Sequence, residues 1–176
     1  ADWPEEIEVG YRAASPLVEL KLTTRNEQGE QLLPIWQTKL EDLLGAHVLS
    51  FSDKNSDQPA SIAKCLVDLL ALNKQTLSTA ESCTGGLIAS NITRIPGSSA
   101  VFEAGYVTYS NRIKSQCLKV QEQTLIANGA VSEAVVLEMA QGALKASGSD
   151  WTISVSGIAG PDGGTDDKPV GTVWLC

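Results

Sequence analysis

The stretch Thr79-Ala80-Glu81-Ser82-Cys83-Thr84-Gly85-Gly86 decides the fold of this chain, because an apolar run ends there and an amphipathic segment follows it. Residues 75–79 fit a short buried strand. The apolar residues after the stretch recur at helical spacing: Leu87, Ile88, Ile92 and Ile95. The pattern predicts a strand, a tight turn and a helix. Ser82 then lies at the carboxyl end of the strand, with Cys83 or Thr84 near the helix N-terminus.

Backbone N–H groups at such a turn are unpaired and favour negative charge, and Gly85 and Gly86 let a ligand approach the backbone closely. Turns of this composition are also common as simple helix caps in α/β domains. The octapeptide by itself therefore leaves a ligand site and a structural cap as equal alternatives.

Composition limits the class of protein. The chain has 176 residues, of which 43% are apolar, which suits one α/β domain with a small additional module. The net charge of −8, concentrated before residue 58, argues against a nucleic-acid partner. The sequence contains no run of 18 apolar residues and no signal peptide, so we expect a cytoplasmic protein that does not enter a membrane.

Cysteine and histidine usage restricts the chemistry. The four cysteines show no C-x-x-C pairing, which predicts free thiols and no structural metal: Cys65, Cys83, Cys117 and Cys176. His47 is the only histidine and lies in the N-terminal part. Any hydrolytic reaction in the larger domain must therefore use another base.

The first 53 residues predict a small α+β module. Residues 5–24 alternate apolar and polar side chains, as an antiparallel hairpin does. A helix follows, with Pro34 in its first turn and Gly45 as its stop, and residues 47–51 suggest a third short strand. A polar linker, residues 54–59, separates this module from a second domain, residues 60–176.

The second domain alternates helices and strands. The first helix is expected at residues 59–72, with an inward face formed by Ile62, Cys65, Leu66 and Leu69. A strand at 104–109 precedes a helix that Ser110 or Asn111 caps and that carries Lys114 in its first turn. Further helices are expected at 122–127 and from a Ser132 cap to Gly148, and strands at 151–156 and 170–176.

This order predicts an α/β fold, a three-layer α/β/α domain with a mainly parallel or mixed sheet. Ligands bind such sheets at the carboxyl ends of the strands, where three loops should converge: residues 81–86, 109–114 and 157–164. The sequence ends inside the last apolar run, so we expect the chain to be truncated at its C-terminus.

A nucleophilic Ser82 needs a base to take its proton, and a neutral lysine is one choice. Lys114 has a physical route to a lowered pKa, because its ammonium faces the positive end of a helix dipole and is partly buried at the sheet edge. A Ser–Lys dyad is then reasonable. The alternative is that Lys114 is a solvated surface lysine, as most lysines are.

Four long runs carry a resemblance to a known family: residues 79–86, 96–114 (PGSSAVFEAGYVTYSNRIK), 129–145 (GAVSEAVVLEMAQGALK) and 154–174 (SVSGIAGPDGGTDDKPVGTVW). They closely resemble the CinA C-terminal family, the nicotinamide-nucleotide amidohydrolases. The resemblance implies hydrolysis of the carboxamide of nicotinamide mononucleotide to nicotinate mononucleotide and ammonia, in pyridine nucleotide salvage. It implies neither a metal nor a cofactor.

Carried onto this chain, the family's catalytic serine falls on Ser82 and its lysine on Lys114, with oxyanion donors among the backbone N–H groups of residues 83–85. Tyr109 suits stacking on the pyridine ring, and residues 157–164 suit the 5′-phosphate, with a flexible interface loop as the alternative. Cys83 is a rival nucleophile. The expected substrate contacts are Cys83, Thr84, Gly85, Tyr109, Asn111, Ser132, Ser156, Gly157 and Gly160.

The first module resembles the KH-like middle domain of longer CinA proteins. It lacks the GxxG loop of RNA-binding KH domains and is acidic, so we interpret it as a spacer. In that family an N-terminal domain is associated with ADP-ribose pyrophosphatase activity. An alternative function is therefore a non-catalytic nucleotide-binding or regulatory domain of a longer protein. A homo-oligomer is also expected. The family's last strand and terminal helix continue past Trp174, so a basic residue for phosphate cannot be named.

Overall fold

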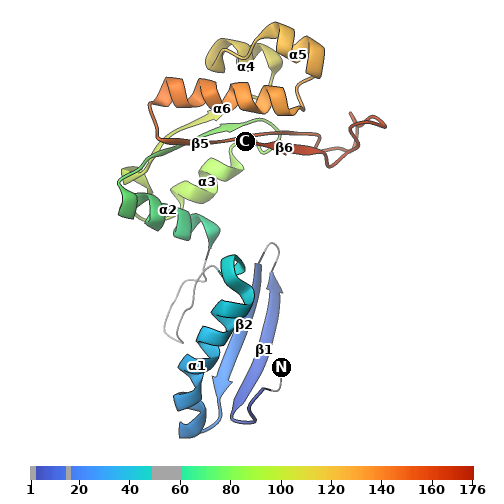
Figure 1. Ribbon diagram of the computed structural model, residues 1–176. Coiled ribbons are helices and arrows are strands. Elements are labelled where there is room, and N and C mark those ends of the chain that lie inside the picture. The colour runs from blue at the N-terminus through green and yellow to red at the C-terminus, as the bar shows by residue number, and fades with distance from the viewer. Residues whose placement is uncertain (1–2, 15–16, 49–60) are drawn as a thin grey trace. The chain divides into compact units, whose positions relative to one another are not determined.

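The computed structural model describes residues 3–14, 17–48 and 61–176, and the chain divides into two compact units, residues 1–57 and 58–176 (Figure 1). The predicted linker, residues 54–59, lies outside the described residues. The same is true of residues 49–51 of the predicted third strand.

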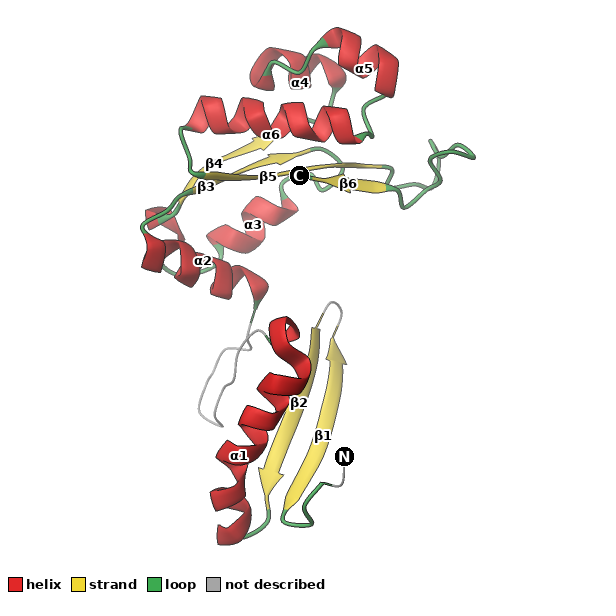
Figure 2. Ribbon diagram, in the orientation of Figure 1, coloured by secondary structure: helices red, strands yellow, loops and turns green. Residues whose placement is uncertain are grey.

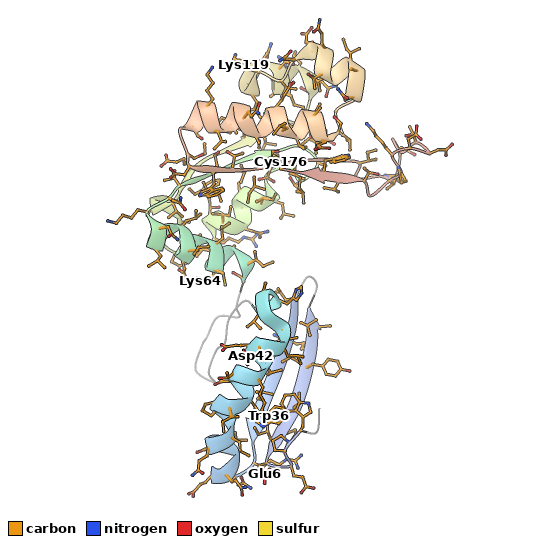
Figure 3. All side chains as sticks on the ribbon, viewed as in Figure 1. Glu6, Trp36, Asp42, Lys64, Lys119 and Cys176 are labelled. Atoms are coloured by element: carbon orange, nitrogen blue, oxygen red, sulfur yellow. The ribbon has the colours of Figure 1, made fainter. Side chains whose placement is uncertain are left out.

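The first unit contains the predicted antiparallel hairpin. Strand β1 (Ile7–Ala14) pairs with β2 (Leu17–Thr24), and helix α1 (Glu27–Leu44) follows. Trp36 lies on α1 (Figure 3). Trp3 stacks on it with ring centroids 4.5 Å apart, and the Lys39 ammonium lies 4.3 Å from the Trp36 ring. The predicted strand does not begin at His47, because residues Gly45–His47 form a short 3-10 helix, η1.

Helix α1 begins earlier than its proline suggested. Asn26 is its N-cap, and the Asn26 side chain accepts a hydrogen bond of 2.8 Å from the N–H of Gly29. Pro34 consequently lies inside the helix and not in its first turn. A helix-interior proline costs about 3 kcal/mol, so this helix depends on its cap and on packing against β2.

The second unit is a three-layer α/β/α domain, as predicted, around a mixed four-stranded sheet (Figure 2). The strand order is β4-β3-β5-β6, with β3 parallel to β4 and β5, and β6 antiparallel to β5. The strands are β3 (Leu77–Glu81), β4 (Phe102–Val107), β5 (Trp151–Gly157) and β6 (Val173–Leu175).

Helices cover both faces of this sheet. On one face lie α4 (Asn111–Leu118), α5 (Glu122–Asn128) and α6 (Glu133–Ser147), and on the other lie α2 (Ile62–Asn73) and α3 (Leu87–Thr93). A short 3-10 helix, η2 (Ser98–Ala100), precedes β4. Strand β3 (Leu-Ser-Thr-Ala-Glu) is buried along its whole length, as a central strand covered by helices on both faces is.

Each face has its own core. The α4–α6 face buries Ala80, Leu118, Val120, Leu125, Val135, Met139 and Ala143. The α2–α3 face buries Val67, Leu70, Leu77, Ile92 and Val101. The predicted inward face of α2 was wrong in part, because Ile62 and Leu69 are exposed. The buried stripe is rotated by about one residue, onto Val67 and Leu70, since the helix is apolar on more than one side.

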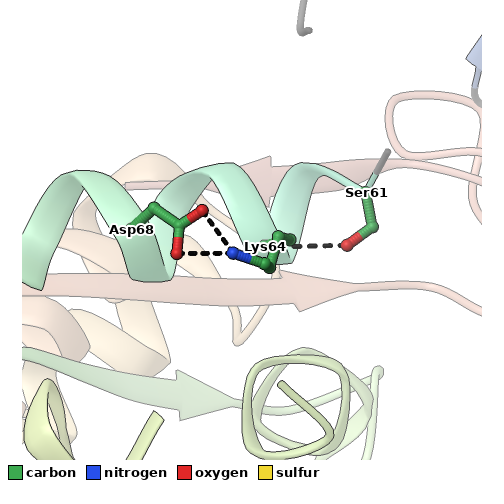
Figure 4. Close-up of polar contacts among 3 residues, drawn as sticks. All are labelled: Ser61, Lys64 and Asp68. Atoms are coloured by element: carbon green, nitrogen blue, oxygen red, sulfur yellow. Dashed lines mark hydrogen bonds and ion pairs between the residues drawn. The ribbon is translucent and has the colours of Figure 1, made fainter. Parts of the chain in front are cut away.

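Helix α2 begins at Ile62, three residues later than expected, because Ser61 caps it. The Ser61 hydroxyl accepts a bond of 3.0 Å from the N–H of Lys64, and Lys64 pairs with Asp68 one turn further along (Figure 4). Pairs of this exposed type contribute about 0.3–0.5 kcal/mol, so the cap and the buried stripe fix this helix more than the ion pair does.

Gly142 lets α6 approach the end of α4, and its replacement is a test of the packing. A Cβ added at Gly142 would lie 1.9 Å from the carbonyl oxygen of Leu118. Alanine normally stabilises a helix by about 0.5–1 kcal/mol relative to glycine, but forced overpacking costs about 1–3 kcal/mol or more. We expect Gly142→Ala to lower the melting temperature, measured by circular dichroism, by about 5 °C.

Gln141→Ala is the matched control, because Gln141 is exposed on the same helix. It should change the free energy of unfolding by less than about 0.5 kcal/mol. Equal melting temperatures for the two variants would contradict the close contact between α4 and α6.

Candidate active site

Three parallel strands end at the same edge of the sheet and bring three hydroxyl residues into one row. Glu81 pairs with Val107 of β4 and Val155 of β5, so the next row holds Ser82, Thr108 and Ser156. The N–H of Ser82 donates to the Val155 carbonyl at 3.0 Å, and that of Thr108 donates to the Glu81 carbonyl at 2.8 Å. Because Ala80 belongs to the core beneath α6, strand alternation places Ser82 on the same face.

Lys114 reaches this row from α4. The hydroxyl of Ser110 caps the helix by accepting a bond from the N–H of Ile113, which fixes the first turn and places Lys114 over the end of the sheet. The side-chain nitrogen, Nζ, lies 2.9 Å from Ser82 Oγ. Lys114 is only 1% exposed and Ser82 only 7%. The interpretation of Lys114 as a solvated surface lysine was therefore wrong.

Two backbone carbonyls complete the surroundings of the amine. Nζ of Lys114 donates to the carbonyl oxygens of Thr108 at 2.9 Å and Tyr109 at 3.0 Å. Burial lowers the pKa of Lys114, because the charged ammonium loses its hydration, while the neighbouring Cys83 acts in the opposite direction. The pKa of Lys114 is lowered overall, which a general base requires because only the neutral amine accepts a proton.

The turn after Ser82 leaves two backbone donors available. The N–H of Gly85 donates to the Ser82 carbonyl at 3.1 Å, so it is already used. Within residues 61–176, the backbone N–H groups of Cys83 and Thr84 form no hydrogen bond with another part of the described chain. Gly85 has a φ of +61° and Gly86 a φ of +97°, conformations that favour glycine and allow the tight return into α3.

Glu81 is a functional candidate within residues 79–86 for which the sequence pattern predicted no role. Its buried carboxylate accepts hydrogen bonds from three N–H groups at the start of α3: Gly86 at 3.1 Å, Ile88 at 3.0 Å and Ala89 at 2.9 Å. Burial alone would raise the pKa of Glu81, but the hydrogen bonds that its carboxylate accepts from the N–H groups of Ala89, Ile88 and Gly86 outweigh burial and lower the pKa. The sequence signal for this role was the position of a carboxylate between a buried strand and the start of a helix.

The predicted contacts on neighbouring loops lie at the same edge. A Cβ at Gly157 would lie 3.0 Å from the Cys83 sulfur, so the ends of β3 and β5 touch there. Tyr109 is 73% exposed, and Asn111 is the exposed first residue of α4. The Cys83 thiol thus lies against Gly157, on the residue that follows Ser82.

Ser132 and Ser156 have internal bonds. The Ser132 hydroxyl donates to the Gly129 carbonyl at 2.9 Å, and that of Ser156 donates to the Ala130 carbonyl at 2.8 Å. Both brace the turn between α5 and α6, and their contact with a substrate stays a prediction.

The glycine-rich loop after β5 folds back on itself. The N–H of Ile158 donates to the Thr172 carbonyl, and the N–H of Gly171 donates to the Ile158 carbonyl, both at 2.9 Å. Gly160 packs against Val170, and the Lys168 ammonium donates to the Asn128 carbonyl at 2.7 Å. These bonds hold the loop near the turn that Ser132 and Ser156 brace.

Two further features concern the described ranges 3–14, 17–48 and 61–176. These ranges contain no group of three or more His, Cys, Asp or Glu side chains placed to hold a metal ion. They also contain no helix that is both long and apolar enough to cross a membrane.

Comparison with known proteins gives consistent matches. The family model described as CinA C-terminal domain matches residues 59–176. A CinA-like protein from Colwellia psychrerythraea is 54% identical over 173 residues, which cover 98% of this chain and 39% of that protein. The protein named nicotinamide-nucleotide amidohydrolase PncC in Escherichia coli K12 is 65% identical over 100 residues, which cover 57% of this chain and 61% of that protein.

A solved structure agrees with the fold. The crystal structure of a competence-damaged protein (CinA) superfamily protein from Escherichia coli matches with a TM-score of 0.64 and 35% identity. The match covers 75% of this chain and 76% of that one. This chain thus spans only part of the length of its relatives.

Proposed function

The chain belongs to the CinA family, and from this membership and the buried Ser82–Lys114 pair we propose that it hydrolyses the carboxamide of nicotinamide mononucleotide to nicotinate mononucleotide and ammonia. A relative named nicotinamide-nucleotide amidohydrolase supports this choice of substrate. The proposal concerns the site within residues 61–176, because the chain spans 39% of the Colwellia relative.

The observation that carries the proposal is the environment of the Lys114 amine. A neutral amine has two N–H bonds and one lone pair. The carbonyls of Thr108 and Tyr109 accept the two N–H bonds, which leaves the lone pair directed at Ser82 Oγ, 2.9 Å away. In this state the amine accepts the serine hydroxyl proton, which is the arrangement of a general base.

Acylation then follows from this geometry. Ser82 Oγ attacks the carboxamide carbon while its proton passes to Lys114 Nζ, and the carbonyl oxygen takes the negative charge. The free N–H groups of Cys83 and Thr84 stabilise that oxyanion. When the tetrahedral intermediate collapses, the C–N bond breaks, the Lys114 ammonium returns its proton to the nitrogen, and ammonia leaves an ester on Ser82.

Deacylation uses the same groups in the reverse roles. A water molecule attacks the ester carbon and gives one proton to Lys114 Nζ. Collapse of the second intermediate breaks the bond to Ser82 Oγ, which takes the proton back from Lys114. The carboxylic acid that forms loses its remaining proton to solvent, so nicotinate mononucleotide leaves as the carboxylate, and the dyad returns to its starting state. No step requires a metal.

The remaining residues suit the rest of the substrate. The exposed ring of Tyr109, beside Asn111, is available to stack on the pyridine ring. The backbone of the loop containing Gly157 and Gly160 offers N–H groups for the 5′-phosphate. The remaining contacts assigned to the substrate are Cys83, Thr84, Gly85, Ser132 and Ser156.

The direct test is incubation of this chain with nicotinamide mononucleotide and quantification of both products. We expect ammonia and nicotinate mononucleotide in equal amounts, with the Escherichia coli protein named PncC as the positive control. A chain that is folded by circular dichroism but binds the nucleotide without releasing ammonia would favour a non-catalytic binding domain instead.

The pH dependence of kcat/KM provides an independent check. Because only the neutral amine is a base, kcat/KM should rise with pH, about tenfold per pH unit, up to the pKa of Lys114, which burial holds below the ordinary lysine value. A kcat/KM that falls with rising pH over this range would contradict a lysine base.

A further inference from the structure

Glu81 precedes the nucleophile directly but acts from the opposite face of the sheet. Strand alternation places Ser82 on the α4–α6 face and Glu81 on the face that α3 covers. The main chain of Glu81 is fixed in the centre of the sheet, between Val107 and Val155. Its carboxylate is fixed to the N–H groups of Gly86, Ile88 and Ala89.

These two attachments enclose the reactive turn. Residues 82–85 leave the sheet after Glu81, and the next residue, Gly86, binds the side chain of the same Glu81 through its N–H group. A single residue therefore sets the distance between the start and the end of the turn. The turn contains Ser82 Oγ and the free N–H groups of Cys83 and Thr84, whose relative positions decide whether a carbonyl can be attacked and its oxygen bound.

Helix capping alone does not account for this residue. Elsewhere in the described chain, short neutral side chains cap the N-termini of four helices: Asn26, Ser61, Ser110 and Ser132. A buried carboxylate is much more costly to desolvate than a serine or an asparagine. Its three bonds offset that cost, and they hold the turn to α3 more firmly than one hydroxyl bond does.

We propose that Glu81 is a positioning residue, which holds the turn of residues 82–85 so that Ser82 Oγ stays aligned with Lys114 and the N–H groups of Cys83 and Thr84 converge on the oxyanion. The proposal rests on the proposed amidohydrolase function. It also means that the first N–H groups of α3 are occupied, so they do not bind the substrate phosphate.

The test is Glu81→Gln, which keeps the size of the side chain but replaces one acceptor oxygen with an NH₂ group that faces a backbone donor. A displacement of about 1 Å at a reacting group costs about 100-fold in rate. We therefore expect kcat for nicotinamide mononucleotide to fall about 100-fold, with KM and the affinity for nicotinate mononucleotide changed less than about twofold. Glu81→Asp keeps the charge but is shorter, and should give an intermediate loss.

Glu138→Gln is the matched control. Glu138 is also a carboxylate that binds the start of another helix, since it accepts bonds of 2.7 Å from the N–H of Gln121 and the hydroxyl of Thr124 at α5. It lies on α6 and binds the start of α5, not the turn of residues 82–85. If Glu81 only caps α3, Glu81→Gln and Glu138→Gln should both lower the melting temperature. Both should then leave the kcat of the folded enzyme within about twofold of the unsubstituted chain. That outcome would overturn the proposal.

A second readout separates this proposal from the choice of substrate. Phenylmethylsulfonyl fluoride transfers its sulfonyl group to an activated serine oxygen with loss of fluoride, whatever the natural substrate is. The rate of Ser82 labelling should fall in Glu81→Gln and Glu81→Asp but not in Glu138→Gln. If the unsubstituted chain releases no ammonia but this pattern holds, the amidohydrolase function fails and the positioning role stands. Equal labelling rates in the unsubstituted chain and in all three variants would overturn the positioning role. If Glu81→Gln does not fold, the same conclusion follows from equal rates in Glu81→Asp, Glu138→Gln and the unsubstituted chain.

Discussion

Ser82→Ala is expected to reduce the rate of ammonia release from nicotinamide mononucleotide by about 10⁴-fold or more, because losses of this size follow removal of the nucleophile from a catalytic unit. Alanine removes only the hydroxyl oxygen. The buried row of residues, the Lys114 amine and the free N–H groups of Cys83 and Thr84 remain. The affinity for nicotinamide mononucleotide, measured by calorimetry, should therefore stay within about threefold of its original value.

Ser99→Ala is a suitable control, because Ser99 is an exposed serine of η2 that has no part in the site. The rival nucleophile, Cys83, is tested by Cys83→Ala in the same assay. Activity that survives in Ser82→Ala but disappears in Cys83→Ala would assign the nucleophile to the thiol. Unchanged affinity with no ammonia release from any protein, including the unsubstituted chain, would point to a binding domain.

Lys114→Met is expected to have the second-largest effect, a decrease in kcat/KM of about 10³-fold, since general bases contribute about 10²–10⁴-fold. Methionine is unbranched and neutral, so it fills much of the space of the lysine stem but accepts no proton from Ser82. In Lys114→Met, the rise of kcat/KM with pH should also be lost, because the group that titrates is gone. The double variant Ser82→Ala/Lys114→Met should be no slower than Ser82→Ala, because the two residues act as one unit.

Lys114→Arg distinguishes a base from a simple cation. Arginine keeps the positive charge and donors for the Thr108 and Tyr109 carbonyls, but it does not lose its proton in proteins. A lysine that only pairs with phosphate should be replaced well by arginine, whereas a base should not. We expect Lys114→Arg to be nearly as inactive as Lys114→Met. Lys119→Met, at the C-terminus of α4 (Figure 3), is the control and should retain activity.

Local signals in the sequence were sufficient for the parts of the site that lie within one element. The sequence predicts Ser110 or Asn111 as the cap of α4 and Ser132 as the cap of α6, and the structure shows Ser110 and Ser132 as these N-caps. The strand-turn-helix around Ser82 follows from a change in hydrophobic period at residues 79–86, which is also local. The sequence therefore placed Ser82 and Lys114 on the right elements.

Contacts between elements were beyond this kind of inference. The orientation of α2 depends on which apolar side meets the sheet, and Ile62 and Leu69 turned out to be exposed. The role of Glu81 depends on the path of the chain five to eight residues later. Pro34 was misplaced because the stronger signal, the Asn26 cap, lies eight positions before it. In each case several interactions compete to decide the position of a residue, and the spacing of residues in the sequence does not show which interaction is strongest.

Strand β3 is the first strand of its unit in the chain and yet lies in the middle of the sheet. Its pairing with β4 closes a short segment, but its pairing with β5 joins residues 74 positions apart, as in the bond from the N–H of Thr76 to Asp150. Pairings so distant in sequence form slowly, because chain entropy is lost before the contact is gained. The bond from Ser82 to Val155 is therefore expected to form late in folding, and a nascent or partly folded chain does not yet hold Ser82 in its native position.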